Sequence, residues 1–566
     1  MPKLFHLHIE NFRGIKRFDH TFKDGLTCII GRGDSGKSTI LEAISSVLSA
    51  SYSLQFNDGD FYNCDVSKPI VIQVVITELN EEILRKLGNH IIGIKDGEII
   101  ESMLDEKAID AEEAVRIELR VKKDLEPEWA LLGVSGTEPR PIRASERELF
   151  NCFYISDYND RHFTLSKGTP LSSLFKQKSE RKLDVLNAEL IANLGRTVKI
   201  GFNTAIQEQE VFNEVFEAIS KNATSLGLNA GEVKASIDQR EFLLKENKIA
   251  LHRNDIPLRQ LGKGSKRILS LAIQLSLTSP SGIILIDEIE QGLEPDRVQQ
   301  IVAYLGACRG IQVIFTTHSQ HAVEELECDN LFIKTSDSET LQPISTALQG
   351  LVRKHPLALF AKSIIIGEGA TEYGFIRGMN EIRQQQGGKS MSFYGVCPIN
   401  GNGDECVATA MHLVDLGFRV CLLCDSDVDK INAQKDNLRT NGVSIYDCAD
   451  GMAFESQLFN DCHWETVKAL INYRISCNQN SKGVFENIRH HLIEQRDYCD
   501  DWYVNESDNL RIALSKASGN KNNPWFKSIG MGHDVALIVL GDMNKLDHGT
   551  QLYKNISSLY SWIEMA

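Results

Sequence analysis

The chain has 566 residues and a formal net charge of −16, with 42% hydrophobic and 24% charged residues. This length is too great for one hydrophobic core and predicts two to four domains. The acidic balance excludes a protein that coats nucleic acid through its whole surface, although a local groove or bound metal ions could hold DNA. No apolar run reaches the roughly 18 residues of a membrane span, and the first residues lack a signal-peptide layout. We therefore expect a cytoplasmic protein with no membrane partner.

The first 76 residues predict strands on both sides of a glycine-rich loop. Residues 3–30 contain two apolar runs, LFHLHIENF and LTCII, joined by a charged turn, and a third run, PIVIQVVI, follows at Pro69–Ile76. Runs of this composition are typical of strands. We expect the three strands to form one mixed sheet around the loop.

The loop itself, GRGDSGKST, lies between the LTCII strand and the helical run TILEAISSVL. It matches the phosphate-binding pattern G-x-x-x-x-G-K-[ST] in the strand-to-helix context that this pattern requires. Backbone N–H groups of such a loop surround phosphate oxygens, Lys37 reaches the β- and γ-phosphates, and Ser38 can ligate Mg²⁺. The predicted ATP-binding residues of the loop are Gly31, Gly33, Asp34, Ser35, Gly36, Lys37, Ser38 and Thr39.

The middle of the chain predicts a helical insert. From about Leu171 to Ser225, apolar residues recur at helical spacing, for example at Leu183, Leu186 and Leu190. The apolar face of this insert could pack on its own domain or on a second copy of the chain.

Features of a nucleotide-binding domain return in GIILIDEIEQGLEP and IQVIFTTHS. The apolar run Ile283–Ile286 predicts a buried strand that ends at Asp287, a residue placed to hold the Mg²⁺ of the nucleotide. Glu288 follows where a base could polarise a hydrolytic water. His318 follows the next strand, where it could sense the γ-phosphate. A strand-end acid or a lone histidine is common in structural roles, but three such features after a phosphate loop favour an ATP site.

Together with NFRGI near the start, these motifs resemble the ATP-binding cassette heads of the SMC, Rad50 and RecF class, in which two heads enclose ATP. That class places a signature loop before the DE strand, and LGKGSKR at Leu261–Arg267 occupies this position. It lacks the serine that usually precedes the glycines. The resemblance implies that Gly262 and Gly264 contact nucleotide, that Arg13 lines the pocket, and that the chain forms a homodimer or a higher oligomer.

Acidic residues follow the strands of a second α/β region that begins at Ser363. Glu368 ends the apolar run in SIIIGEGATEYGF, Glu372 lies one helical turn later, and FRVCLLC ends at Asp425-Ser-Asp427. Alternating strands and helices predict a parallel sheet, which holds ligands beyond its carboxyl ends. Carboxylates gathered there suit Mg²⁺ or Mn²⁺ and two-metal phosphodiester chemistry. A solvated acidic edge is the simpler alternative.

This region resembles a TOPRIM domain, whose pattern of one glutamate after the first strand and DxD after the third is matched by Glu368, Asp425 and Asp427. A cassette head followed by TOPRIM resembles the OLD family of ATP-linked nucleases. That family completes its centre with further acidic positions and a lysine, which correspond to Glu455 in GMAFESQLF and Lys527 in NNPWFKSIG. The catalytic residues then expected are Glu288, His318, Glu368, Asp425, Asp427 and Lys527. The expected metal ligands are Ser38 and Asp287 in the head, and Glu368, Glu372, Asp425, Asp427 and Glu455 in TOPRIM.

The expected fold is α/β. An ABC-type ATPase head at 1–170 and 226–350 is interrupted by the insert at 171–225, and a TOPRIM domain with helical elaborations follows at 351–566. The favoured function is an ATP-hydrolysing, metal-dependent DNA endonuclease or nickase with ATP and Mg²⁺ as cofactors, or Mn²⁺ at the TOPRIM centre. The family suggests defence against phage, with a helicase, or a reverse transcriptase and its nucleic acid, as candidate partners. A DNA-bound ATP switch with a weak TOPRIM centre and a primase-type nucleotidyl transferase remain as alternatives.

Overall fold

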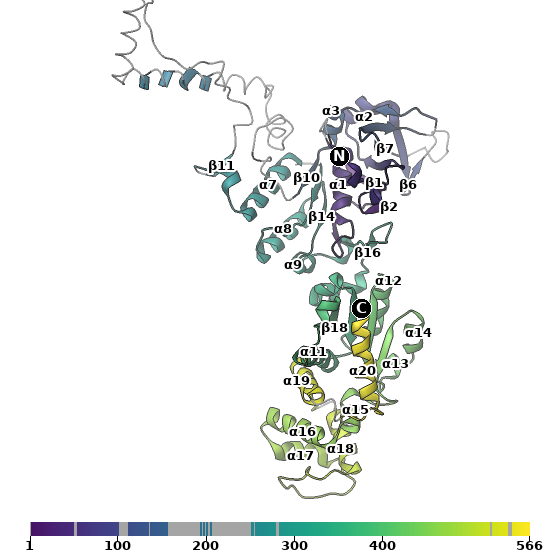
Figure 1. Ribbon diagram of the computed structural model, residues 1–566, viewed down its shortest axis with the longest axis vertical. Coiled ribbons are helices and arrows are strands. Elements are labelled where there is room, and N and C mark those ends of the chain that lie inside the picture. Colours follow the sequence, from purple (N-terminus) through teal and green to yellow (C-terminus); the bar gives the residue numbers. More distant parts are fainter. Residues whose placement is uncertain are drawn as a thin grey trace, which may run out of the picture. The chain divides into compact units, whose positions relative to one another are not determined.

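The computed structural model describes most of the chain outside its middle third (Figure 1). The described residues are 2–49, 54–100, 111–134, 136–156, 251–253, 255–278, 282–520, 523–541 and 546–565, with a few isolated positions between 163 and 205. The predicted helical insert at 171–225 therefore lies almost entirely outside the described residues. None of the described helices combines the length and apolar character that crossing a bilayer would require.

The described residues form two compact units. Unit 1 consists of Met1–Ile29, Gly36–Thr317 and Ser336–Thr340, and unit 2 consists of Ile30–Ser35, His318–Thr335 and Leu341–Ala566. The four domain segments predicted from the sequence remain predictions, because these units follow compactness alone.

An antiparallel sheet of eight strands lies in unit 1. Its main path is β2 (Ile15–Thr21), β1 (Lys3–Phe12), β4 (Ile70–Thr77), β7 (Glu112–Val121), β5 (Ile91–Lys95) and β6 (Glu98–Ile100), with β8 (Pro127–Leu132) and β9 (Arg140–Pro141) branching from β7. The strand β2 occupies the stretch that we predicted as a charged turn. Only Ile15 and Phe18 of this edge strand are buried, so its exposed charged residues give it the composition of a loop.

The strand that precedes the phosphate loop lies in a second sheet of unit 1. Its parallel strands lie in the order β10 (Cys152–Ile155), β13 (Gly282–Ile286), β14 (Ile311–Thr316) and β3 (Leu26–Ile30). All residues of β3, β13 and β14 are buried, as in parallel sheets covered on both faces. The prediction of a single mixed sheet is wrong, because β1 and β4 pair in the antiparallel sheet while β3 belongs to the parallel one.

Five helices of unit 1 have described bounds. They are α1 (Lys37–Leu48), α2 (Glu81–Leu87), α3 (Ala144–Arg147), α7 (Lys263–Thr278) and α8 (Pro295–Ala307), and a short hairpin of β11 (His252–Arg253) and β12 (Ile256–Pro257) precedes α7. Among these helices, α1 and α7 contact the parallel sheet. Helix α1 contacts β13 and β14, so the helix after the phosphate loop lies against the strands that end near Asp287 and Thr316.

Unit 2 is built on a four-stranded parallel sheet. Its order is β18 (Val396–Asn400), β17 (Ser363–Gly367), β19 (Arg419–Cys424) and β20 (Ser444–Asp447). Helices α11 (Ala370–Gln385), α12 (Glu405–Asp415), α13 (Asp429–Asn432) and α14 (Lys435–Thr440) connect these strands, and α9 (Gln320–Glu324), β15 (Leu331–Ile333), β16 (Gln342–Pro343) and α10 (Gln349–Lys354) precede them. The predicted α/β class is therefore confirmed. Because β17 and β19 are neighbours, the residues that follow them meet at one edge of the sheet.

The C-terminal helices of unit 2 share one apolar core with this sheet. They are α15 (Phe454–Asp461), α16 (Trp464–Asn478), α17 (Ser481–Arg489), α18 (Asp508–Ser518), α19 (Ile529–Leu540) and α20 (Gln551–Glu564). Helix α19 packs along α11 (Figure 1). A Cβ atom on Gly374 would lie 2.2 Å from the carbonyl oxygen of Ile529, and one on Gly378 would lie 2.5 Å from that of His533. The two glycines therefore permit a close backbone contact that a larger side chain would block.

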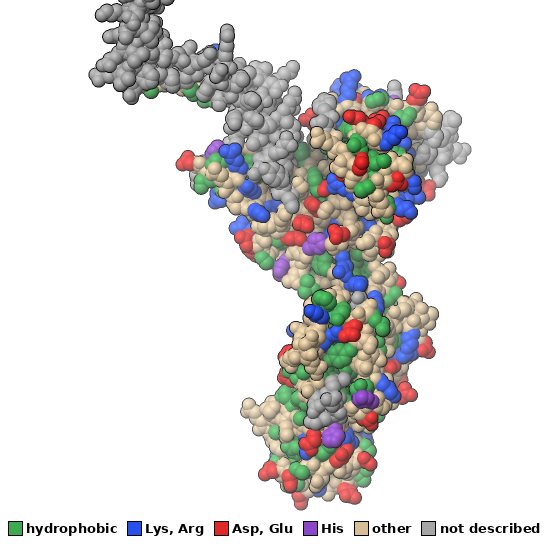
Figure 2. All heavy atoms as spheres, in the orientation of Figure 1, with side chains coloured by type: hydrophobic (Ala, Val, Ile, Leu, Met, Phe, Trp, Pro, Cys, Tyr) green, Lys and Arg blue, Asp and Glu red, His purple; other side chains and the backbone are tan. Residues whose placement is uncertain are grey.

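Charged side chains of both signs are mixed over the face of the molecule shown in Figure 2. No single acidic patch dominates the coloured part of this face.

Candidate functional site

The phosphate loop connects β3 to α1 and takes backbone conformations that favour glycine. Gly36, the N-cap of α1, has a φ of +90°, and Gly31 has a φ of +150°. A Cβ atom on Gly31 would lie 2.3 Å from the carbonyl oxygen of Lys334. Lys37 is buried in the first turn of α1, where helix N–H groups favour an anion. The glycines of the motif are therefore required by the backbone, whatever the loop binds.

Asp287, directly after β13, is hydrogen-bonded to α1, the helix that follows the phosphate loop. Its Oδ1 accepts hydrogen bonds from Ser38 Oγ at 2.9 Å and from Thr316 Oγ1 at 2.6 Å. The two residues predicted to hold the Mg²⁺ of ATP thus lie in direct contact. Thr316 Oγ1 also accepts the backbone N–H of Glu288 at 2.8 Å, and Glu288 has a φ of +47°. We missed Thr316 in the sequence because a threonine at the end of a strand carries no distinctive pattern.

Arg267 of α7 holds the same turn through its backbone. This side chain is buried, and its guanidinium donates hydrogen bonds to the carbonyl oxygen of Asp287, to that of Glu288 at 3.0 Å and to that of Ser156 at 2.8 Å. A turn with a positive φ at its acidic residue is strained, and several fixed donors can hold such a conformation. Arg267 belongs to the predicted signature segment, but this backbone contact could not be inferred from the motif.

The other predicted residues of this segment differ in their surroundings. Gly264 packs closely, since a Cβ atom there would lie 2.5 Å from the carbonyl oxygen of Gly292, whereas Gly262 is exposed. Arg13 has a φ of +49°, donates from Nε to Asp60 Oδ1 at 2.9 Å and pairs with Glu42 of α1.

The remaining predicted residues of the ATP site differ in how far their side chains are exposed to solvent. Gly33 and Asp34 of the loop are exposed, Ser35 is buried and Thr39 is half-buried. His318, the second residue after β14, is exposed, and its ring centroid lies 6.2 Å from that of Phe360 within unit 2.

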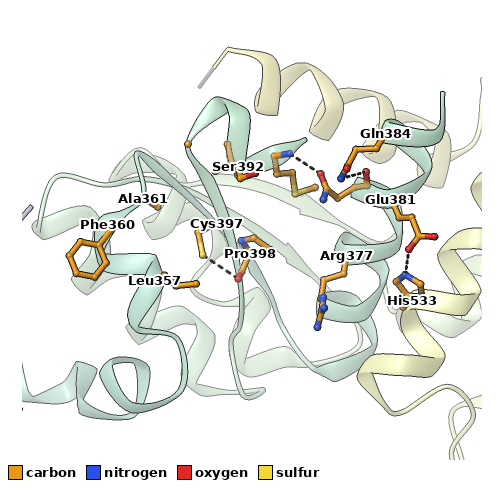
Figure 3. Close-up of a pocket in the computed structure, with 14 residues that line it drawn as sticks. Leu357, Phe360, Ala361, Arg377, Glu381, Gln384, Ser392, Cys397, Pro398 and His533 are labelled. Atoms are coloured by element: carbon orange, nitrogen blue, oxygen red, sulfur yellow. Dashed lines mark hydrogen bonds and ion pairs between the residues drawn. The ribbon is translucent and has the colours of Figure 1, made fainter. Parts of the chain in front are cut away.

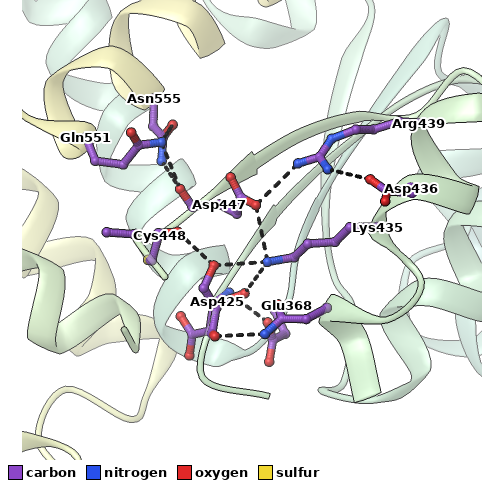
Figure 4. Close-up of polar contacts among 12 residues, drawn as sticks. Glu368, Asp425, Lys435, Asp436, Arg439, Asp447, Cys448, Gln551 and Asn555 are labelled. Carbon is purple, nitrogen blue, oxygen red and sulfur yellow. Dashed lines mark hydrogen bonds and ion pairs between the residues drawn. The ribbon is translucent and has the colours of Figure 1, made fainter. Parts of the chain in front are cut away.

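A group of carboxylates lies at the carboxyl edge of the sheet of unit 2 (Figure 4). Glu368 directly follows β17, and its Oε2 accepts the backbone N–H of Asp425 at 2.9 Å. Asp425 directly follows β19, and its Oδ1 accepts the N–H of Phe454 at 2.8 Å. Both carboxylates are buried, whereas Asp427 is exposed. The structure thus joins the first glutamate to the DxD segment, as their positions after neighbouring strands predicted.

Glu455 and Lys527 lie together on the same side of unit 2. Lys527 Nζ is 2.9 Å from Glu455 Oε1, although 72 residues separate the two in the chain. Thr371, in the first turn of α11, lies within hydrogen-bond distance of the same carboxylate oxygen, at 3.3 Å. Glu372, the next residue of α11, accepts the N–H of Gly369 at 2.9 Å through its Oε2. The weak local patterns around Glu455 and Lys527 therefore point to residues that are in contact.

Burial and mutual repulsion raise the pKa values of these acids. Burial raises the pKa of Glu372 to about 7, with Glu455 adding to the increase. Burial also raises the pKa of Asp425 to about 9, and the neighbouring carboxylates of Glu372 and Glu368 contribute. The pKa of Glu368 is raised mainly by its burial, which the hydrogen bond from Asp425 partly opposes. Such carboxylates ionise fully only when cations compensate them.

Two carboxylate oxygens of this group have no partner among the described residues. They are Oε1 of Glu372 and Oε2 of Glu455, and both are buried. Unpartnered buried oxygens next to ionisable acids fit hard divalent cations such as Mg²⁺ and Mn²⁺. Within the described ranges, no group of three or more acidic, histidine or cysteine side chains is arranged closely enough in this structure to hold a metal ion.

A separate cavity of about 650 Å³ lies beside the edge strand β18 (Figure 3). Apolar residues that include Leu357, Phe360 and Pro398 line it together with Arg377 and His533. None of the residues predicted for catalysis or metal binding lines this cavity.

Three sequence families match consecutive parts of the chain. Residues 3–130 match "AAA ATPase domain", residues 146–324 match "AAA domain, putative AbiEii toxin, Type IV TA system", and residues 359–427 match "Overcoming lysogenization defect protein-like, TOPRIM domain". The chain thus contains an ATPase region followed by an OLD-like TOPRIM region.

Curated relatives match the ATPase region. An ATP/GTP phosphatase of Helicobacter pylori is 24% identical over 350 residues, which cover 57% of this chain and 86% of that protein. The RecF DNA replication and repair protein of Oenococcus oeni is 23% identical over 363 residues, covering 56% of this chain and 93% of that protein. The Rad50 ATPase of Methanosarcina mazei is 56% identical over 41 residues, and the match spans only 4% of its length.

The solved structures that match include an SMC head domain and the recombination mediator protein RecF. An SMC head of Pyrococcus furiosus with 13% identity covers 60% of this chain and 96% of its own at a TM-score of 0.33. A RecF structure with 17% identity covers 61% of this chain and 98% of its own at a TM-score of 0.32.

The matched regions define an AAA-type ATPase region followed by a TOPRIM region. The OLD-like TOPRIM match at residues 359–427 confirms the resemblance that the motifs of this region indicated.

Proposed function

We propose that this protein is an ATP-hydrolysing, divalent-metal-dependent DNA endonuclease or nickase that acts in defence against phage. The observation that carries the proposal is the buried carboxylate group of unit 2, with unpartnered oxygens on Glu372 and Glu455 and with Lys527 paired to Glu455. A structural core would not retain acids whose repulsion raises their pKa values, because unpaired buried charge is costly.

The metal ions would be held by Glu368, Glu372, Asp425, Asp427 and Glu455. When bound, divalent ions polarise a phosphoryl oxygen and lower the pKa of water, which provides a nucleophile near neutral pH. Lys527 supplies a fixed cation beside Glu455, and 44% of its side chain is exposed. It can therefore meet a phosphate that approaches from solvent and stabilise the negative charge that develops there.

The ATPase region would bind ATP through Lys37 and the phosphate loop, with Ser38 and Asp287 at the Mg²⁺ position. The observed contact between Ser38 and Asp287 supports this pairing. Glu288 would act as the base, because Thr316 and Arg267 fix the backbone on each side of it. His318 would sense the γ-phosphate, and Arg13 would line the nucleotide pocket. The signature-loop glycines Gly262 and Gly264 would contact the nucleotide of the second head.

DNA is the proposed substrate, and a homodimer is the proposed assembly. The names of the relatives support the first, since Rad50 ATPase and RecF are named for DNA repair. A helicase, or a reverse transcriptase with its nucleic acid, is the proposed type of defence partner.

The deciding experiment incubates the purified protein with supercoiled and linear DNA, with Mg²⁺ or Mn²⁺, and with or without ATP. We expect nicked or linear products that Glu368→Gln and Lys527→Met abolish. Incorporation of nucleotides instead of new ends would favour primase-type transfer. Stable DNA and ATP binding without cleavage, under every metal condition, would favour the ATP switch.

A further inference from the structure

Lys435, at the start of α14, contacts the segment Asp425-Ser426-Asp427 of unit 2. It is 5% exposed, and its Nζ donates to the carbonyl oxygen of Asp425 at 2.9 Å and to Ser426 Oγ at 3.0 Å. Figure 4 shows these contacts together with those of Glu368 and Asp447. The lysine therefore contacts the backbone of the DxD segment and not the carboxylate of Asp425.

Three separate groups hold Asp425 in place. Glu368 accepts its N–H at 2.9 Å, Lys435 binds its carbonyl oxygen at 2.9 Å, and the N–H of Phe454 binds its Oδ1 at 2.8 Å. Neither contact of Lys435 uses a carboxylate oxygen of the segment. Lys435 can therefore fix the main chain and leave the acid oxygens to a cation.

Ser426 is held just as fully between the two aspartates. Its N–H donates to the carbonyl oxygen of Met452 at 3.0 Å, its hydroxyl donates to that of Cys448 at 2.7 Å, and its own carbonyl accepts from Asn432 at 2.8 Å. The hydroxyl oxygen is also the second acceptor of Lys435, so the lysine and the segment after β20 share one network.

The other side of Lys435 is anchored to β20 and α20. Its Nζ lies 3.3 Å from Asp447 Oδ2, the last residue of β20, and Arg439 reaches the same carboxylate oxygen at 3.3 Å. The carbonyl oxygen of Asp447 accepts from Asn555 at 2.7 Å and from Gln551 at 3.3 Å. The cation is thus fixed on rigid elements, as a group that orients metal ligands needs to be.

We propose that Lys435 is a positioning residue of the metal centre, which holds the DxD backbone in the conformation that binds divalent metal and adds a permanent positive charge beneath the acids. This inference rests on the proposed nuclease function. Groups that orient metal ligands commonly change metal affinity by roughly 10- to 100-fold when removed. A purely structural ion pair would instead change the amount of folded protein and leave the metal affinity of the folded fraction unchanged.

The experiment compares full-length wild type with Lys435→Met and Ser426→Ala. Binding of Mn²⁺ is measured by electron paramagnetic resonance, and cleavage of supercoiled DNA is titrated with Mn²⁺. Lys468→Met is the matched control, because it removes a lysine that pairs with Glu465 on the surface of α16. For Lys435→Met we expect the Mn²⁺ concentration for half-maximal binding and cleavage to rise at least roughly tenfold. For Ser426→Ala, which keeps the cation, we expect a smaller rise, and Lys468→Met should match wild type.

Unchanged Mn²⁺ binding in folded Lys435→Met would overturn the inference. If Lys435→Met does not fold, Ser426→Ala decides, and wild-type Mn²⁺ binding by that variant also contradicts the inference. A failure of the proposed function looks different, because wild type itself would bind Mn²⁺ without cutting DNA. The combined variant should lose less than the sum of the two single effects, since both residues belong to one network.

Discussion

The stability of unit 2 without metal should fall as the pH rises, because Glu372 is a buried acid whose pKa is raised to about 7. The folded state then binds a proton more tightly than the unfolded chain does. Stability from this proton is present below the ordinary pKa of 4.5 and is lost as the pH rises through 7. A shift of this size corresponds to about 3 kcal/mol at pH 8. The raised pKa of Asp425 acts in the same direction.

The change that isolates this effect is Glu372→Gln, which keeps an oxygen to accept the N–H of Gly369 but carries no charge. In EDTA at pH 8 we expect this variant to be more stable than wild type by about 3 kcal/mol, or roughly 6 to 12 °C in Tm. Below pH 4.5 the difference should vanish. The exposed Glu405→Gln on α12 is the control and should show no such trend.

Tryptophan fluorescence provides the assay, because four of the five tryptophans lie in unit 2, at positions 464, 502, 525 and 562. Thermal unfolding is recorded from pH 4 to 8, in EDTA and in Mg²⁺. Added Mg²⁺ should remove the loss in wild type and have little effect on the variant. A wild-type stability in EDTA that is flat or rises from pH 5 to 8 would refute the reasoning.

Four further results are expected. Lys37→Ala should weaken ATP binding. Glu288→Gln should still bind ATP but hydrolyse it at least about 100-fold more slowly, and an unchanged rate of phosphate release would disprove the role of Glu288. Asp425→Ala should abolish DNA cleavage in gel assays and spare ATP hydrolysis, and the opposite pattern would contradict the division of chemistry between the two regions. Gly378→Ala should destabilise unit 2 by about 1 to 3 kcal/mol in urea titrations, while Gly350→Ala, which meets no atom within 4 Å, should not. Light scattering with ATP should report at least a dimer, and a monomer at micromolar concentration would count against the two-head arrangement.

Features that lie on one strand end or one loop were predictable from the sequence. The phosphate loop, the strand before Asp287 and the strands before Glu368 and Asp425 each combine an apolar run with a polar residue at its end. Such local patterns follow from strand burial, so the structure brings Glu368 and Asp425 together as expected.

Contacts through the backbone were not predictable. Arg267 binds carbonyl oxygens about 20 residues away, and Lys435 binds the carbonyl oxygen of Asp425. Any residue type could present such a carbonyl oxygen, and the serine hydroxyl that Lys435 also binds is too common to mark a contact. The strand β2 was missed for a related reason, because an edge strand with two buried residues has the composition of a turn. Sheet membership of β1 and β3 depends on pairing between distant segments, which the apolar pattern of a single strand does not encode.

The pairing of Glu455 with Lys527 has a consequence for how the protein is made. Translation releases the carboxylates at Glu368, Asp425 and Glu455 before Lys527, the lysine that pairs with Glu455, and before the helix α19 that packs on α11. A ribosome that stops short of Lys527 therefore yields a chain with acids in place but without their counterion and without the glycine-lined helix contact. Such an unfinished chain lacks the cation that we propose stabilises the phosphate during cleavage. Under the proposed function, cleavage activity would therefore arise only after synthesis has passed Lys527.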